Sequence, residues 1–229
     1  MRLEPDEGKL SSPVLRGLGR SNPARLPDRH TTQMTYFAIG VEDHYGWANL
    51  VSVAASGPDI TVIDKRRVDL IEPNLAASPY HHETLQMRQS EAEKLVRAVK
   101  ASANRHARTA LATLITELAP ATCRAIAIRT PPLAELPAKV ADVHANYFIM
   151  CRADGMIYHQ ALTRAAAQLD LSVFHFDKSQ ILELAAQVRG LKASTLERRL
   201  NALGRTLKPP WRKGHVVACA GALVAHGAG

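Results

Sequence analysis

The chain has 229 residues, 46% of them hydrophobic, which is enough for one large domain with a substantial core. Lys and Arg (29) outnumber Asp and Glu (21), and the net charge of +8 favours an acidic partner, nucleic acid first and an anionic membrane second. A basic soluble protein that is simply rich in Arg and Ala has the same composition, so charge alone leaves both interpretations open.

Several classes of protein are excluded by what the sequence lacks. The three cysteines, Cys123, Cys151 and Cys219, are far apart and odd in number, which argues against a disulfide framework. No apolar run reaches about 18 residues, so no membrane span is expected. The N-terminus has no apolar core of a secretory signal. Neither a nucleophile elbow nor a phosphate-binding or dinucleotide-binding fingerprint is present. We therefore expect a cytoplasmic protein.

Residues 1–33 are rich in Arg, Pro, Gly, Ser and Asp and show no hydrophobic periodicity. Such a segment buries too little apolar surface to offset its chain entropy, so a flexible basic tail is expected before a domain over residues 34–229. Translation beginning at Met34, just before the first predicted strand, is the alternative.

Three strands joined by short turns are predicted next, because Val, Ile, Thr and aromatic residues are dense there. In the first strand Ala38, Gly40 and Glu42 share one face, and the small residues would let a helix pack closely over it. Tyr45 and Trp47 in the first hairpin could stack on bases, but packing against the sheet is the commoner outcome. The predicted strands are Tyr36–Val41, Ala48–Ala54 and Ile60–Val68.

A long helix over residues 91–118 follows, opened by a capping box of Ser90 and Glu93. Its apolar residues form one stripe at helical spacing. A second stripe is basic and suits a phosphate backbone, although an ordinary solvated face has the same pattern. The basic residues of this stripe are Lys94, Arg97, Arg105 and Arg108.

The remaining chain alternates between strands and helices. A buried strand over Cys123–Ile128 ends at Arg129, and another over Ser172–Phe176 ends at Asp177. Helices are expected at 133–151 with a break at Pro137, then at 153–169, 179–188, 194–206 and 214–225. The last part before the final helix is strongly basic and includes Arg198, Arg199 and Arg205.

This order of elements resembles the ribonuclease H-like fold, and Ile39-Gly40-Val41-Glu42 is similar to the first-strand motif of Holliday-junction resolvases of the RuvC type. Pro209-Pro210-Trp211 before the last helix resembles a segment of related uncharacterised bacterial proteins. The resemblance implies an α/β fold with a mixed five-stranded sheet, three antiparallel strands then two parallel, and helices on both faces. It also implies that Glu42 is the first acid of a metal site.

Departures from the resolvase pattern are equally informative. The family's second acid falls on Arg129, and the first turns of the final helix carry His215 but no carboxylate. Asp43 follows Glu42 directly, so without a bulge it faces the opposite side of the sheet. The candidate catalytic residues are Glu42, Asp43, Asp177 and His215, and Glu42 is also the candidate ligand for Mg²⁺ or Mn²⁺. A structural role for Glu42, such as pairing with Arg129, is the alternative.

Three functions remain open at this point. The first is a nucleic-acid-binding protein of resolvase type that has lost most of its metal ligands, and the second is an active metal-dependent nuclease. The third is a non-catalytic scaffold that forms a homodimer. The candidate nucleic-acid-binding residues are all basic: Lys94, Arg97, Arg105, Arg108, Arg129, Arg198, Arg199 and Arg205.

Overall fold

The computed structural model describes residues 35–131 and 135–228. The tail expected over residues 1–33 and the alternative start at Met34 lie outside these residues. Within the described ranges, no helix combines the length and the apolar character needed to cross a membrane.

A single sheet of five strands, in the order β3-β2-β1-β4-β5, forms the centre of the described chain. β1 (Tyr36–His44), β2 (Trp47–Ser56) and β3 (Asp59–Asp69) form an antiparallel meander. β4 (Thr122–Arg129) and β5 (Ser172–Phe176) extend it in parallel from β1. This mixed sheet, with helices on both faces, confirms the expected α/β, ribonuclease H-like fold class.

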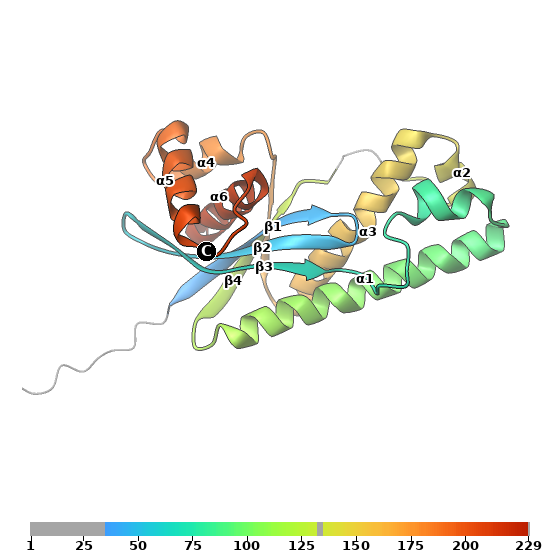
Figure 1. Cartoon of the computed structure of the whole chain (residues 1–229), viewed down its shortest axis with the longest axis horizontal. Coiled ribbons are helices and arrows are strands. Elements are labelled where there is room, and N and C mark those ends of the chain that lie inside the picture. The colour runs from blue at the N-terminus through green and yellow to red at the C-terminus, as the bar shows by residue number, and fades with distance from the viewer. Residues whose placement is uncertain (1–34, 132–134, 229) are drawn as a thin grey trace, which may run out of the picture. The chain divides into compact units, whose positions relative to one another are not determined.

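The two faces of the sheet are covered by different helices. α1 (Gln89–Glu117) and α3 (Tyr147–Gln168) pack on the face that carries Phe37, Ile39 and Val41. On the other face, α6 (Lys213–Ala228) packs over the strands, with α4 (Ile181–Val188) and α5 (Ala193–Thr206) against it. Figure 1 shows α4, α5 and α6 gathered on one side of the sheet and the long α1 on the other.

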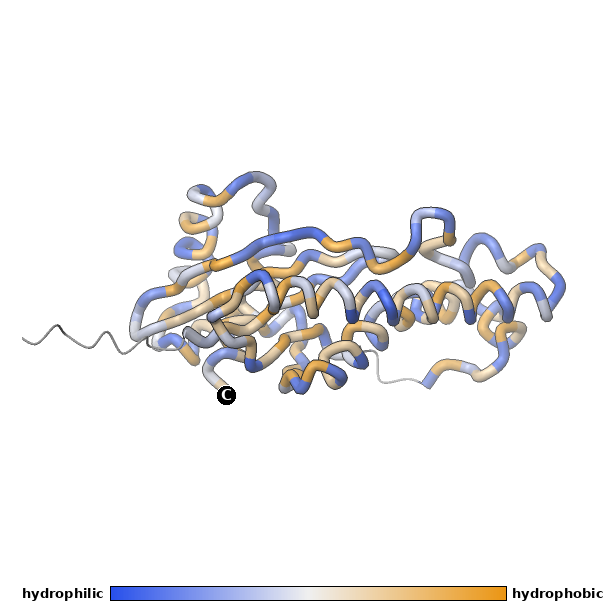
Figure 2. Tube along the Cα trace, turned by 90° about the horizontal axis from the view of Figure 1, so that it is seen from below, coloured by the Kyte–Doolittle hydropathy of each residue, from blue (hydrophilic) through white to orange (hydrophobic). Residues whose placement is uncertain are grey.

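Shorter elements complete the chain. A π-helical turn (Pro79–Glu83) and a 3₁₀ turn (Thr84–Gln86) precede α1, and α2 (Val140–His144) precedes α3. Hydrophilic and hydrophobic residues alternate along α1 in Figure 2, as expected of a helix with one buried stripe.

The close approach predicted for the β1 face is present. A Cβ atom added at Gly40 would lie 1.7 Å from the carbonyl oxygen of Ala218 in α6. Only a residue without a side chain fits there, so Gly40 brings the backbone of α6 down onto β1.

Several predicted boundaries are wrong for identifiable reasons. β1 does not stop at Val41 but continues to His44, because the hairpin turn uses Gly46 at a φ of 78°. The capping box is absent, since α1 begins at Gln89 and Ser90 lies inside it. α3 begins at Tyr147 rather than 153, because the Asn146 side chain accepts hydrogen bonds from Phe148 and Ile149.

Candidate nucleic-acid interface

Glu42 and Asp43 point to opposite faces of the sheet, because both lie inside β1 and no bulge falls between them. Glu42 pairs with Asn49 in the β1–β2 register and faces the first turn of α6. Asp43 faces the α3 side. The first-strand motif therefore delivers one carboxylate, not two, to the α6 face.

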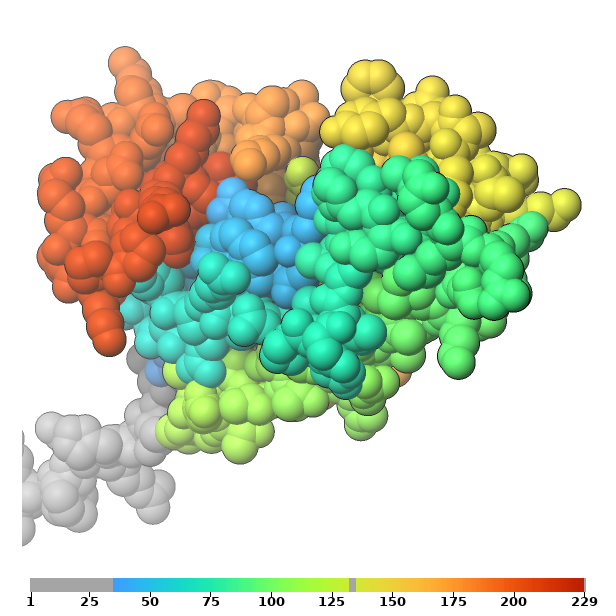
Figure 3. Space-filling view, turned by 45° about the vertical axis from the view of Figure 1, so that its right-hand side comes forward, coloured from blue at the N-terminus to red at the C-terminus, as the bar shows by residue number. Residues whose placement is uncertain are grey.

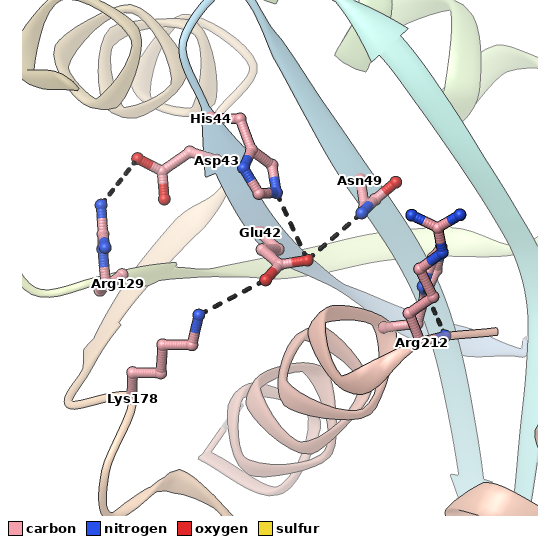
Figure 4. Close-up of polar contacts among 8 residues, drawn as sticks. Glu42, Asp43, His44, Asn49, Arg129, Lys178 and Arg212 are labelled. Carbon is pink, nitrogen blue, oxygen red and sulfur yellow. Dashed lines mark hydrogen bonds and ion pairs between the residues drawn. The ribbon is translucent and has the colours of Figure 1, made fainter. Parts of the chain in front are cut away.

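Nitrogen atoms surround the Glu42 carboxylate (Figure 4). Asn49 Nδ2 donates to Oε2 at 3.3 Å, and Lys178 Nζ lies 3.5 Å from Oε1. His44 Nε2 lies 3.6 Å from Oε2. A Cβ atom at Gly214 would lie 1.4 Å from Oε2, so the carboxylate abuts the first turn of α6, where the helix dipole favours an anion. The protein itself supplies the counter-charges of Glu42.

The residues around Glu42 do not fit a site for Mg²⁺ or Mn²⁺. Such a site needs several hard oxygen ligands, and two-metal hydrolysis needs carboxylates around both ions. Here the groups nearest to Glu42 are an amide nitrogen, an imidazole and an ammonium. No group of three or more His, Cys, Asp or Glu side chains in residues 35–131 and 135–228 is arranged to hold a metal ion.

Arg129, where the resemblance to resolvases predicts a second acid, pairs with Asp43 rather than Glu42. Its guanidinium lies 3.4 Å from Asp43 Oδ2, and the Asp43 side chain is only 6% exposed. A hollow of about 140 Å³ is lined by Glu42 and Asp43 together with Arg129 and Lys178. Each of the two carboxylates at this end of the sheet is therefore paired with a cation of the protein.

Asp177 and His215 are engaged in local structure. Asp177 Oδ1 accepts from the backbone and the hydroxyl of Ser179, both at 2.7 Å, and these hydrogen bonds lower the pKa of Asp177. His215 is buried, and its Nδ1 accepts from the Arg212 amide at 3.1 Å. Burial, aided by Lys65, lowers the pKa of His215. Of the four predicted catalytic residues, Glu42 and His215 line the same groove, and Asp43 and Asp177 do not.

That groove, which we call the α6 groove, has a volume of about 630 Å³. One wall is the sheet and the other is the segment leading into α6. In Figure 3 the red surface of the α6 region borders the blue and cyan surface of the strands. The basic residues that line the groove are Lys65, Arg66, Arg67, Lys208, Arg212 and Lys213.

Three of these cations, Lys65, Arg66 and Arg67, have structural partners, and the partner of Arg67 is Asp69, 3.7 Å away. Lys65 Nζ donates to the carbonyls of Lys208 (2.6 Å) and Pro210 (2.7 Å), which ties residues 208–210 to β3. Arg66 donates to Asp64 and Glu117, and its hydrogen bonds to Asp64 are the main reason that its pKa is raised. Lys65 and Arg66 are therefore already occupied within the protein.

Trp47 packs against its strand neighbours, as expected. Its ring stacks on His44 of β1 at 3.8 Å, and the Arg67 guanidinium of β3 lies 4.2 Å from it. Because β2 lies between these two strands, the ring is flanked from both sides by protein groups. It stiffens the groove wall and is not a free platform for a base.

The other three cations, Lys208, Arg212 and Lys213, are exposed. Within the described parts of the chain, no carboxylate lies within 4 Å of their charged atoms. They follow one another along one wall of the α6 groove. Sequence reasoning did not assign Arg212 or Lys213, although a Trp-Arg-Lys run after two prolines was the available signal.

Seven of the eight basic residues predicted from the sequence, all except Arg129, fall on two surfaces. Arg198, Arg199 and Arg205 line a second hollow of about 990 Å³ beside α5, which shares Pro209 with the α6 groove. Lys94, Arg97, Arg105 and Arg108 are exposed on α1, which covers the opposite face of the sheet. There Arg97 pairs with Glu93 and Arg105 with Glu72.

Two solved structures of RuvC are similar to this chain. Against "T. thermophilus RuvC in complex with Holliday junction substrate" the identity is 14% and the TM-score 0.44, over 82% of this chain and 91% of that one. Against a second Thermus thermophilus RuvC structure the identity is 12% and the TM-score 0.45, over 82% and 92%. No protein-family model matches the sequence, and no curated protein is found to be similar.

Proposed function

We propose that the chain binds structured or duplex nucleic acid through phosphate contacts in the α6 groove, and that its resolvase-type metal site is degraded. The observation that carries the proposal is the set of three exposed cations that line the groove, Lys208, Arg212 and Lys213, none of which has a carboxylate within 4 Å among the described residues. A carboxylate partner neutralises part of a cation's charge, whereas these three cations keep their full charge for a phosphate.

The adjoining hollow beside α5 lengthens the basic surface. Arg198, Arg199 and Arg205 line it, and Pro209 is common to both hollows. Phosphates recur regularly along a nucleic-acid strand, so a continuous basic track gains affinity at each contact and releases counterions. The α1 stripe is the weaker candidate, since Arg97 and Arg105 are paired with carboxylates.

The degraded-site part of the proposal rests on the surroundings of Glu42. Lys178, Asn49 and the first turn of α6 contact its carboxylate, and Arg129 lines the hollow beside it. The two carboxylates that line this hollow, Glu42 and Asp43, each have a cation of the protein beside them, Lys178 and Arg129. We propose that Glu42 orders this end of the groove and does not coordinate a metal.

The test is a binding titration by fluorescence anisotropy with a labelled four-way DNA junction and a labelled duplex. The variant replaces Lys208, Arg212 and Lys213 with Gln, and we expect at least about a tenfold loss of affinity. The matched control replaces Lys94, Arg97 and Arg108 on α1 with Gln, which removes the same charge, and it should bind nearly as the unaltered protein does. Equal losses in both variants would show only a net-charge effect.

Activity distinguishes the proposal from its enzymatic rival. The same DNA is incubated with Mg²⁺ or Mn²⁺ and analysed for cleavage. Cleavage by the unaltered protein that vanishes in Glu42→Gln would establish a working nuclease and overturn the degraded-site proposal. A homodimeric scaffold remains a prediction, which light scattering without nucleic acid would test.

A further inference from the structure

A second cavity lies on the α3 side of the sheet, across from the α6 groove, and has a volume of about 320 Å³. It is formed by Tyr45 in the β1–β2 turn, Arg129 and Thr130 at the end of β4, and one face of α3. This volume is in the range of cavities that hold small organic molecules, roughly 300–1,000 Å³. We call it the Tyr45 cavity.

Gly155 lines the Tyr45 cavity and adds no side chain to it. It lies in the middle of α3, where Gly is less favourable than Ala. Packing does not require it, because a Cβ atom there would meet only the Tyr45 ring, at an ordinary contact of 3.5 Å. A helix that gives up this stability without a steric need leaves space that a ligand can use.

The charged groups at the cavity are cations. Arg129 and Arg152 both line it, and no Asp or Glu is among its described lining residues. Arg129 donates one hydrogen bond to the Asp43 carboxylate at 3.4 Å, and Arg152 donates to the Glu135 carbonyl at 3.0 Å. A guanidinium has five N–H donors, so each Arg retains donors for an oxyanion.

A buried polar group at the same place lacks a partner. His159 lines the cavity and is 6% exposed, and its Nδ1 has no hydrogen-bond partner among the described residues. The Nε of Arg152 is also buried without a partner there. A buried polar group without a partner is destabilising, and a bound ligand could satisfy it. The remaining wall is apolar, formed by Met156, Pro131 and the ring of Tyr45, whose hydroxyl donates to the Cys151 carbonyl at 3.1 Å.

We propose that the Tyr45 cavity binds a small organic oxyanion, a carboxylate or phosphate carried on a planar apolar body. The anionic group pairs with Arg129 or Arg152, and the body lies in the space over Gly155, against Met156. This proposal does not rest on nucleic-acid binding in the α6 groove, because the Tyr45 cavity and that groove share no described lining residue.

The first experiment is isothermal titration calorimetry with four probes. Phenyl phosphate and benzoate carry the same ring on different anions, benzyl alcohol has the ring without the charge, and inorganic phosphate has the charge without the ring. We expect saturable binding of phenyl phosphate, benzoate or both, at least about tenfold tighter than either partial probe. Whichever anion binds identifies the head group. Absence of saturable binding by both anions at millimolar concentrations would overturn the proposal.

Variants locate the binding. Gly155→Leu fills the cavity and should abolish ligand binding. Gly155→Ala fits sterically and should weaken ligand binding, so the test remains valid if the larger variant does not fold. Ala167→Leu adds the same side chain at an exposed position of the same helix and should have no effect. Unaltered binding by a folded Gly155→Leu protein would contradict the assignment.

Cys151 provides an independent readout, because it lines the cavity. Burial raises the pKa of Cys123 and of Cys219 to about 12, so at pH 8 both thiols stay protonated and react slowly. The anion that binds should slow the alkylation of Cys151 by iodoacetamide, measured by peptide mass spectrometry. An unchanged rate at saturating ligand would place the molecule elsewhere.

Discussion

The two neighbouring acids of β1 lie on opposite faces of the sheet and have different surroundings. Glu42 contacts Lys178, Asn49 and the positive end of α6, and it lines a groove that also carries exposed basic residues. Asp43 is buried on the other face and takes a single contact from Arg129. Adjacent residues of a strand face opposite sides of the sheet, so the two carboxylates have different surroundings. A short acidic motif in the sequence does not show which side each carboxylate faces.

Packing differs between the faces in the same way. The α3 face uses large side chains such as Phe37 and Ile39, whereas the α6 face uses Ala38 and Gly40, so that α6 lies almost on the strand backbone. Close approach is what places the first turn of α6 against Glu42. The comparison yields three predictions about stability, the largest effect first.

Gly40→Ala should be the most damaging change, because its Cβ would lie 1.7 Å from a backbone oxygen of α6, and a helix must move to make room. We expect a loss of at least about 3 kcal/mol in the free energy of unfolding, at the upper end of overpacking effects. On the opposite face, Ile39→Val should cost only about 1 kcal/mol. Urea denaturation measures both, and similar values would remove the distinction between the faces.

Gly214→Ala should have an intermediate effect, because its Cβ would lie 1.4 Å from a Glu42 carboxylate oxygen, the movable end of a side chain. We expect a loss of about 1–2 kcal/mol. In a Glu42→Ala background the same change should be neutral or slightly stabilising, since Ala is the better helix former. A double-mutant cycle measures this coupling, and additive effects would show that Glu42 does not rest on α6.

The pH dependence of stability should show the smallest effect. His215 accepts a hydrogen bond at Nδ1 and has a lowered pKa when folded, so the unfolded chain binds the proton first. Its contribution is therefore present above the unfolded pKa of about 6.5 and is lost as pH falls through the folded value. Unfolding free energies between pH 7.5 and 5 should decrease less in His215→Gln. An identical decrease in both proteins would show that His215 is not responsible.

Local patterns predicted much of the fold and part of the site. The meander, the parallel strands and the face shared by Ala38, Gly40 and Glu42 followed from alternation and residue type. The α6 groove did not, because its walls come from β3 and from residues 208–215, about 140 positions apart. Lys178 near Glu42 and Arg129 on Asp43 are likewise contacts between distant segments. Which side chains meet at the end of a strand depends on tertiary structure, so local sequence patterns do not predict these contacts.

The most direct test of nucleic-acid binding in the α6 groove is the salt dependence of junction binding. Each lost phosphate contact lowers the slope of log K against log salt concentration by about 0.9. Replacing Lys208, Arg212 and Lys213 with Gln should therefore reduce the slope by about 2–3, whereas the matched α1 variant should leave it unchanged. An unchanged slope in the groove variant, or an equal reduction in the α1 variant, would contradict the account.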